Sequence, residues 1–227
     1  MDFTAENSLY RLNKKIIQCN LCPRLSNYVN LVSQVKVKRF RDEQYWAKPL
    51  QGFGDVKAKL LVIGLAPAAH GGNRTGRMFT GDKSGDWVAK AMFETGFANI
   101  STSQSSNDGL ILKEAYITSV VRCAPPLNKP SLVEILNCSQ HLLAELHILD
   151  NTTKVILTLG KVAFDTFRKI SNVSGSTFYH GGYYKISNGK TLLVSYHPSR
   201  HNTNTGKLTW QMWIDIFKTA RSIITDK

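Results

Sequence analysis

The chain lacks the segments that would place a protein in or across a membrane. No hydrophobic run approaches the roughly 18 apolar residues of a membrane-spanning helix. The N-terminal segment, MDFTAENSLYRLNKK, lacks the apolar core of a secretory signal peptide. With only four cysteines and no secretory signal, disulfide bonds are not expected either. These absences predict a cytoplasmic protein that does not contact a membrane.

Acidic residues are missing from two long segments of a basic chain. The formal net charge is +13 and the sequence pI is about 9.7. Residues 7–41 contain eight Lys and Arg, residues 166–214 contain six together with three His, and neither segment contains Asp or Glu. A generally basic proteome would explain the sum but not two acid-free segments. If the two segments fold together, they make a basic face that binds a polyanion.

Length and periodicity indicate one α/β domain over residues 1–227. Hydrophobic residues make up 42% of the chain, which is enough for one buried core. Strand-like apolar runs alternate with helix-like segments, and this alternation favours a parallel sheet covered on both faces. We therefore expect a three-layer α/β/α sandwich with a central, mainly parallel four-stranded sheet. The expected strands are residues 60–63, 115–121, 154–159 and 192–196, and the expected helices are residues 8–18, 24–38, 86–94, 132–147 (capped by Ser131), 161–170 and 206–224.

The stretch from residue 60 to residue 87 has the composition of a binding site. It begins with the apolar run LLVI, which reads as a buried strand, and continues as GLAPAAHGGNRTGRMFTGD. Glycine is used where the backbone takes positive φ or approaches a ligand closely, and this loop is rich in it. A nucleotide phosphate loop is the alternative, but neither GxxxxGK[ST] nor GxGxxG is present. Asn73, Arg74, Phe79 and Asp82 favour a functional site over a purely structural loop.

The four cysteines form two pairs, Cys19-x2-Cys22 and Cys123-x14-Cys138. Four thiolates suit zinc or an iron–sulfur cluster. The second spacing is wide, with Cys123 at a strand end and Cys138 inside a helix. It is unlike the tight pattern of a zinc ribbon and leaves room for a larger cluster between helices. Four ordinary buried thiols are the alternative.

A second polar motif follows the last apolar strand. Residues 176–188 and 190–195 read as a hairpin around the turn at 187–189, and the second arm also fits the fourth strand of the central sheet. That arm leads into HPSRHNTNTGKL, residues 197–208. His197 follows a strand, so we expect it at the same sheet edge as the glycine-rich loop. A lone histidine is more often structural, but the basic, acid-free surroundings favour a role in binding an anion.

Together these motifs resemble the uracil-DNA glycosylase superfamily, and within it family 5, the type B enzymes. Residues 64–82 are similar to the first motif of the family, and residues 197–208 are similar to the second. The cysteines correspond to the 4Fe–4S ligands of the cluster-bearing families, and RCAPPLNKP (122–130) is also family-like. The resemblance spans residues 19–210. It implies a monofunctional DNA glycosylase of base excision repair that flips uracil out of DNA and hydrolyses its N-glycosidic bond.

The resemblance also implies a role for each residue of the base pocket. Phe79 corresponds to the phenylalanine that stacks on the flipped base, although core packing is its alternative. His197 corresponds to the histidine that stabilises the base O2 as negative charge develops on the leaving base. The pocket is expected to be lined by Gly64, Leu65, Ala66, Pro67 and Ser119.

Two departures from related families concern the attacking water and the choice of base. Other families carry a polar residue just after the first glycine, where this chain has Leu65 and Ala66, and family 5 is defined by that absence. Asn73 is then the candidate that positions the water, and Asp82 is a second candidate that also fits a helix cap. Related families carry Asn at the strand position where this chain has Thr118 and Ser119. A looser pocket that accepts hypoxanthine, xanthine or ethenocytosine follows from this difference.

The second motif is expected to contact DNA containing deaminated bases. Leu208 is the candidate wedge that fills the vacated stack, and the alternative is that it begins the apolar face of the last helix. The expected 4Fe–4S ligands are the four cysteines, with a structural role. We expect a monomer, and a sliding clamp is a candidate partner. The other expected DNA contacts are Arg74, Ser199, Arg200, His201, Asn202, Thr205 and Lys207.

Two other classes of protein remain alternatives. A non-catalytic nucleic-acid-binding protein with a zinc or iron–sulfur knot would explain the charge and the cysteines, but not the pairing of the glycine-rich loop with HPS. A nucleotide hydrolase would turn over free nucleotide and would not need a duplex.

Overall fold

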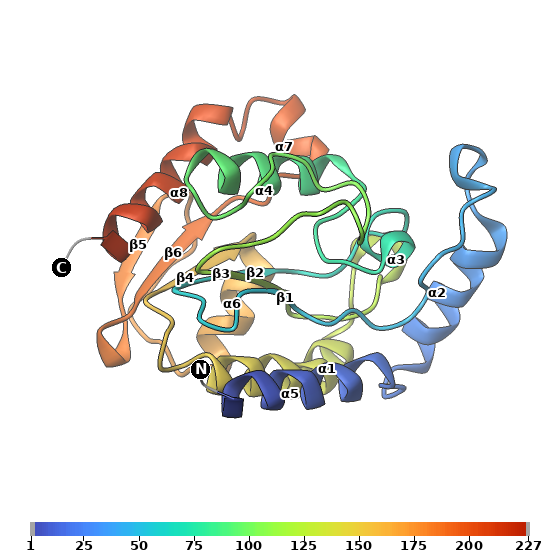
Figure 1. Cartoon of the computed structure of the whole chain (residues 1–227), viewed down its shortest axis with the longest axis horizontal. Coiled ribbons are helices and arrows are strands. Elements are labelled where there is room, and N and C mark those ends of the chain that lie inside the picture. The colour runs from blue at the N-terminus through green and yellow to red at the C-terminus, as the bar shows by residue number, and fades with distance from the viewer. Residues whose placement is uncertain (1–2, 226–227) are drawn as a thin grey trace.

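The computed structural model describes residues 3–225, which form a six-stranded sheet with helices on both faces (Figure 1). The strand order is β1-β3-β2-β4-β6-β5. The inner strands β3, β2, β4 and β6 are parallel, whereas the edge strands β1 and β5 are antiparallel to their neighbours. The predicted four-stranded sheet is this parallel core, and the two edge strands correct the strand count to six. The strands are β1 Phe53–Gly54, β2 Leu60–Gly64, β3 Ala115–Ser119, β4 Val155–Leu159, β5 Gly182–Lys185 and β6 Thr191–Ser195.

The helices make two outer layers around the sheet. Helices α4 and α8 cover one face, and α1, α5 and α6 cover the other (Figure 1). Within the described residues, no helix is long and apolar enough to cross a membrane. The helices are α1 Phe3–Ile17, α2 Pro23–Val35, α3 Gly72–Thr75, α4 Lys83–Glu94, α5 Leu132–Ile148, α6 Lys161–Ile170, α7 Arg200–Asn204 and α8 Trp210–Thr225, with short 3-10 turns at Lys38–Phe40, Pro126–Asn128 and Ser187–Gly189.

Strand residues are buried on both faces of the sheet, which explains why their sequences are continuous apolar runs. Along β2, Leu60 and Val62 pack under α4 and α8, while Leu61 and Ile63 pack against the opposite helix layer. This alternation follows from the two-residue period of a strand. Every residue of β2, β3, β4 and β6 is buried. The parallel sheet is therefore the centre of the core, and its carboxyl edge carries the loops.

Local sequence signals set several of the element ends. Ser131 accepts a hydrogen bond from the Glu134 backbone N–H, and the Glu134 side chain reaches back to the Ser131 N–H, so the predicted cap of α5 is confirmed. The predicted helix at 161–170 is confirmed as α6. Helix α2 ends at Val35, earlier than predicted, because Lys36 takes a φ of 41°. The last helix begins at Trp210 rather than at residue 206, and the short helix α7 precedes it.

The predicted hairpin and the predicted fourth strand are both present in residues 176–195, although the first arm of the hairpin is only Gly182–Lys185. Strand β5 pairs antiparallel with β6 as the hairpin requires, with Gly182 opposite Val194. Strand β6 also pairs in parallel with β4 as the fourth strand of the core. The hairpin arm and the core strand are thus the same segment.

Candidate active site

The glycine-rich loop and the second motif meet at the carboxyl edge of the parallel strands. Strands β2 and β6 lie on either side of β4 and run in the same direction, so the loops that follow them emerge on the same side. The rings of Phe79 and His197 face each other with centroids 5.9 Å apart and planes 28° apart. The Ser84 hydroxyl donates to the Pro198 carbonyl at 2.9 Å, which ties the start of α4 to the second motif. The two motifs therefore form one site.

Phe79 is held in place by glycines at two points. A Cβ added at Gly64 would lie 2.7 Å from the Phe79 ring, so the ring rests directly on the end of β2. A Cβ at Gly85 would lie 2.3 Å from the Phe79 carbonyl oxygen. Phe79 itself takes a φ of 48°, in the left-handed region that non-glycine residues seldom adopt. The aromatic ring is thus fixed over the strand end by its close-packed neighbours.

His197 lies in a setting that keeps its ring neutral. Its Cβ is 3.4 Å from the position of a Cβ at Gly160, which follows β4. Its carbonyl accepts from the Ser199 N–H and from the Asn202 side-chain amide, both at 2.8 Å. Burial lowers the pKa of His197 to about 4, so the imidazole is uncharged at neutral pH. A neutral imidazole offers one N–H donor without carrying a positive charge into the pocket.

Asn73 presents an oxygen that lacks a protein partner. Its side chain is fully buried, and its amide nitrogen donates to the Ala69 carbonyl at 3.3 Å. Among the described residues, its Oδ1 atom has no hydrogen-bond donor. Buried polar atoms are rarely left unpaired, so this acceptor suits a bound water. The geometry fits the role in positioning water that was expected for Asn73.

Asp82 caps α4 and also reaches the turn that carries Asn73. One carboxylate oxygen accepts from the Gly85 N–H at 2.9 Å, so the predicted alternative role as a cap is confirmed. The other oxygen lies over Gly71, where an added Cβ would approach it to 2.1 Å. Burial raises the pKa of Asp82, although hydrogen bonds from the helix N-terminus oppose the shift. The second oxygen makes Asp82 a carboxylate at the edge of the site.

The remaining pocket residues lie along the ends of β2 and β3. The Leu65 carbonyl accepts a hydrogen bond from the Val121 N–H at 2.9 Å. Pro67 is buried, and Ala66 packs against the core on the face of the sheet that α1, α5 and α6 cover. Ser119 pairs with Gly64 across the sheet. Its hydroxyl donates to the Val121 carbonyl at 2.8 Å and is buried. The serine is therefore in the expected place, but its proton is engaged by the backbone.

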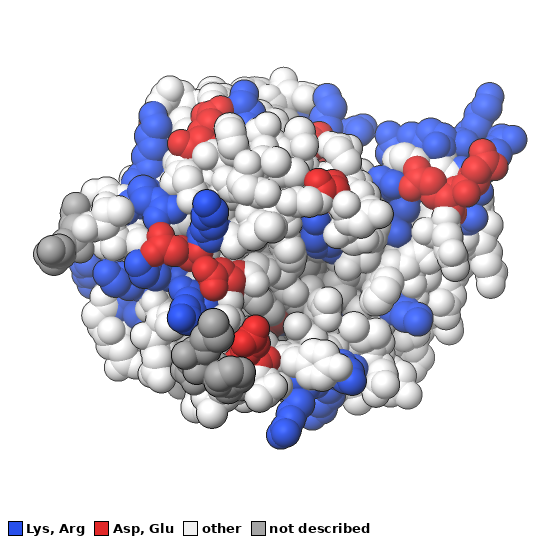
Figure 2. Space-filling model, in the orientation of Figure 1, with Lys and Arg blue, Asp and Glu red and all other residues white. Residues whose placement is uncertain are grey.

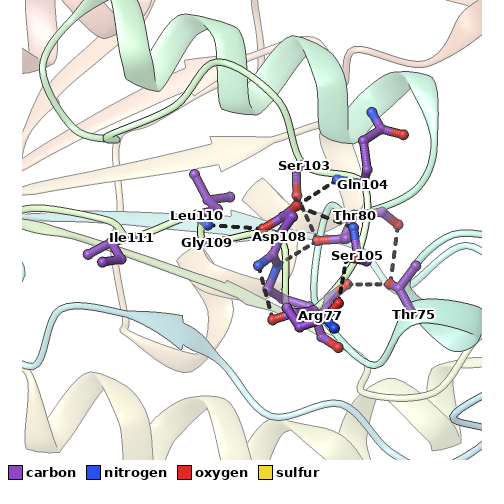
Figure 3. A network of polar contacts seen from close by, with 12 residues as sticks. Thr75, Arg77, Thr80, Ser103, Gln104, Ser105, Asp108, Gly109, Leu110 and Ile111 are labelled. Atoms are coloured by element: carbon purple, nitrogen blue, oxygen red, sulfur yellow. Dashed lines mark hydrogen bonds and ion pairs between the residues drawn. The ribbon is translucent and has the colours of Figure 1, made fainter.

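A buried polar network that the sequence did not predict supports the Phe79 loop (Figure 3). Arg77 donates to Asp108 at 2.7 Å, to Ser103 Oγ at 3.0 Å and to Thr80 Oγ1 at 2.9 Å. The Gly81 N–H donates to the Ser103 carbonyl at 2.8 Å. Residues on both sides of Phe79 are thereby tied to the polar loop at 99–108. The sequence pointed to Arg77 only through its place in the glycine-rich loop. Nothing in the sequence indicated that Asp108 would be its partner.

The residues expected to contact DNA fall into two groups. Arg200, His201, Thr205 and Lys207 are exposed on or just after α7. The others are engaged inside the protein: Ser199 caps α7, Asn202 holds the His197 carbonyl, and Arg74 bonds to Glu43, His70 and Gly81. Leu208 is fully buried in the core on the face of the sheet that α4 and α8 cover. Its burial matches the alternative core role and leaves no exposed tip for a wedge.

The four cysteines line one cavity between α2, α5 and the segment after β3. Cys123 and Cys138 are buried, and Cys19 and Cys22 are half-buried. The Arg122 N–H points to Cys138 Sγ at 3.3 Å, and the Asn137 amide points to Cys22 Sγ at 3.8 Å. Burial raises the pKa of Cys138 to about 11, and neighbouring thiols contribute. Within the described chain, the sulfurs do not close into a group around a single metal ion.

Comparison with known proteins places these features in a family. The family model described as "Uracil DNA glycosylase superfamily" matches residues 51–220. A Type-5 uracil-DNA glycosylase of Mycobacterium leprae is 42% identical over 219 residues, covering 95% of this chain and 96% of the relative. The Type-5 uracil-DNA glycosylase of Thermus thermophilus is 42% identical over 90% of this chain and 93% of its own length. A Type-4 uracil-DNA glycosylase of Thermotoga maritima is 24% identical over 98% of this chain and 97% of its own. The chain therefore belongs to the uracil-DNA glycosylase superfamily, in which it groups with the type-5 enzymes.

Proposed function

We propose that this protein is a monofunctional DNA glycosylase that excises uracil from DNA in base excision repair. It hydrolyses the N-glycosidic bond of a flipped nucleotide, leaves an abasic site and does not cut the DNA backbone. The observation that supports this most directly is the Phe79 ring facing a neutral His197 above the glycine at the end of β2. A flat base extruded from a duplex needs this kind of aromatic platform and polar donor.

Phe79 and His197 have different roles toward the flipped base: Phe79 stacks on it and His197 donates a hydrogen bond to it. Stacking on Phe79 contributes about 1–3 kcal/mol, as for other aromatic platforms under bases. Cleavage develops negative charge on the leaving base, and the neutral imidazole donates a hydrogen bond to its carbonyl oxygen. A donor aimed at developing charge typically accelerates a reaction by about 10²–10³-fold. Ser199 and Asn202 support this donor by holding the His197 carbonyl.

Asn73 and Asp82 are the candidates for handling the attacking water. The unpartnered Oδ1 of Asn73 accepts a hydrogen bond from the water and orients it. An amide cannot take a proton, so the carboxylate of Asp82, whose second oxygen lies over Gly71, is the candidate base. Leu65 and Ala66 offer no polar group to replace either residue.

The range of bases follows from the pocket wall at Ser119. Its hydroxyl proton is used by the Val121 carbonyl, so this residue does not read the uracil edge as an amide side chain would. We therefore propose that hypoxanthine and other deaminated bases are also excised. A labelled duplex bearing hypoxanthine, treated with enzyme and then alkali, tests this extension separately from uracil.

The cysteine cavity fits a 4Fe–4S cluster held by Cys19, Cys22, Cys123 and Cys138. Soft sulfur donors surround one cavity, and N–H groups point at two of them, as is usual around such clusters. The cluster would cross-link the α1–α2 junction to α5 and the end of β3, which is a structural role. In this reading the enzyme acts as a cytoplasmic monomer, with a sliding clamp as a candidate partner.

The decisive experiment compares excision with binding in a matched pair of variants. His197→Ala is expected to slow alkali-revealed cleavage of a uracil duplex by about 10²–10³-fold while DNA affinity changes little. His147→Ala, an exposed histidine in the last turn of α5 and outside both motifs, is the control for removing an imidazole. Because burial lowers the pKa of His197 to about 4, the wild-type rate should show no inflection from this residue near pH 6.5. Equal loss of excision and binding would favour a non-catalytic nucleic-acid-binding protein, and turnover of free nucleotide would favour a nucleotide hydrolase.

A further inference from the structure

A basic segment projects from the end of the molecule next to the active site. Residues 36–48, which we name the arm, follow α2 and extend beyond α3 at the right of Figure 1. Figure 2 shows several Lys and Arg side chains on this projection, with acidic side chains among them. The arm contains five Lys and Arg against two acidic residues. Neither motif of the family lies in it.

The arm is fastened to the glycine-rich loop through Arg74. The Arg74 guanidinium lies over the Phe40 ring, 3.9 Å from its centroid, and also forms an ion pair with Glu43. The Arg39 guanidinium lies 4.4 Å from the same ring. Only 9% of the Arg74 side chain is exposed, so this arginine is an anchor rather than a free phosphate contact. Arg74 therefore fixes the position of the arm on the glycine-rich loop.

Backbone contacts fix the arm to the turn that carries the water-binding candidate. The Ala47 N–H donates to the Asn73 carbonyl at 3.1 Å, and the Trp46 N–H donates to the Arg74 carbonyl at 3.0 Å. The Tyr45 hydroxyl lies 3.0 Å from His70 Nδ1 in the same loop. The arm thus has a defined position relative to the pocket and is not a loose tail.

The outer side of the arm carries cations that the protein itself does not neutralise. Lys38 and Arg41 are exposed, and among the described residues neither has an acidic partner. Glu43 is engaged by Arg74, which leaves Asp42 as the exposed acid of the arm. Exposed cations on a fixed frame lose little entropy on binding an anion, because the backbone is already ordered.

We propose that the arm is a DNA-backbone clamp in which Lys38 and Arg41 bind phosphates of the duplex beside the flipped nucleotide. The proposal rests on the proposed glycosylase function and identifies a binding surface outside both motifs. A duplex presents a phosphate charge every ~1.7 Å along its axis, which suits closely spaced cations. Because the arm is joined to the Asn73 turn, the clamp also sets where the duplex enters relative to the pocket.

The test measures the salt dependence of binding to an undamaged duplex, which needs no catalysis. Each phosphate contact contributes a slope of about 0.9 in log affinity against log salt concentration. Lys38→Ala combined with Arg41→Ala is expected to weaken binding and lower the slope by about 1.8. Both residues are exposed, so the melting temperature should stay at the wild-type value.

The matched control is Arg168→Ala combined with Lys169→Ala, which removes the same charge from the last turn of α6. That helix begins after β4 at the pocket edge and runs away from it, and both residues are exposed. The proposal would be overturned if the arm variant kept the wild-type salt slope, or if the slope of the control fell by the same amount. An unchanged slope in the arm variant would point to an acidic protein as the partner of the arm. Uracil excision by the wild type is measured in parallel. If the wild type excises uracil but the salt slope of the arm variant is unchanged, the clamp is wrong and the glycosylase function stands. If the wild type does not excise uracil but the slope of the arm variant falls, the glycosylase function is wrong and the clamp stands.

Discussion

At the scale of single residues, Asp82 combines two roles that one substitution can separate. Its carboxylate caps α4 through the Gly85 N–H, and its second oxygen lies over Gly71 at the site. Asparagine caps helices as well as aspartate does but cannot accept a proton. Asp82→Asn should therefore keep the free energy of unfolding within about 0.5 kcal/mol and slow uracil excision by about 10²-fold or more. Denaturant unfolding and single-turnover excision measure the two effects.

The matching substitution at the other water candidate is Asn73→Ala. It removes the unpartnered buried oxygen and leaves the Asp82 cap intact. If Asp82→Asn excised uracil at the wild-type rate while Asn73→Ala did not, the water would be handled by Asn73 without a carboxylate. The base assigned to Asp82 would then be wrong.

The roles of individual residues could be predicted from the sequence where the residues lie in a motif. The motifs indicated Phe79 and His197 together, and the structure brings their rings face to face. The sequence could not show that His197 is neutral, because its pKa depends on burial by residues far along the chain. It also could not show that Arg74 is enclosed by Phe40 and Glu43 or that Leu208 is buried, since each fact depends on tertiary contacts.

At the scale of elements, the Arg77–Asp108 pair joins the loop that precedes α4 to the loop that follows it (Figure 3). Burial alone would raise the pKa of Asp108, but Arg77 and three backbone N–H groups hold it well below its usual range. Asp108→Ala leaves Arg77, only 6% exposed, without a counter-charge. Removing one partner of such a pair costs about 3–5 kcal/mol, and we expect a loss of that size in the free energy of unfolding. The exposed Asp42→Ala is the control and should change it by less than about 0.5 kcal/mol.

The pH dependence gives this prediction a second readout. The pKa of Asp108 is lowered in the folded state, so its stabilisation is present above the ordinary carboxyl pKa and is lost only as the pH falls through the folded value. The difference between wild type and Asp108→Ala should therefore stay constant from pH 7 to pH 5. A difference that vanished within that range would show that Asp108 does not pair with Arg77 as an ion.

Element boundaries show where sequence patterns reach their limit. Continuous apolar runs identified the four core strands, because parallel strands are buried on both faces. Strand β1 has only two residues and no apolar run, so its pairing with β3 had no signal. Helix α7 is a single short turn of polar residues capped by Ser199, and its sequence resembles a loop. Such elements are fixed by the neighbours on which they pack.

At the scale of the whole molecule, the cysteine cavity is the place where the N-terminal helices are joined to the sheet domain. Cys19 and Cys22 lie at the junction of α1 and α2, Cys123 lies beyond β3, and Cys138 lies on α5. The sequence predicted this convergence from the two cysteine pairs and from the resemblance to the cluster-bearing families. Cys22 and Cys123 are far apart in the sequence, so the sequence does not explain why they meet. They meet because α1 and α2 pack on the same core as α5 and the end of β3.

A cluster bound at this cavity should hold the N-terminal helices against α5. Cys138→Ser should lose iron, lower the melting temperature and expose the segment at residues 3–35 to limited proteolysis, because the cross-link that the cluster would supply between these helices and α5 would be broken. Ser139→Ala is the control, since Ser139 neighbours Cys138 on α5 and is buried to a similar degree. Phe79 and His197 lie in loops at the carboxyl edge of β2 and β6 and not at the cysteine cavity, so the folded variant should keep most of its excision rate. Retention of full stability and activity by Cys138→Ser would instead mean that these are four ordinary thiols around a small cavity.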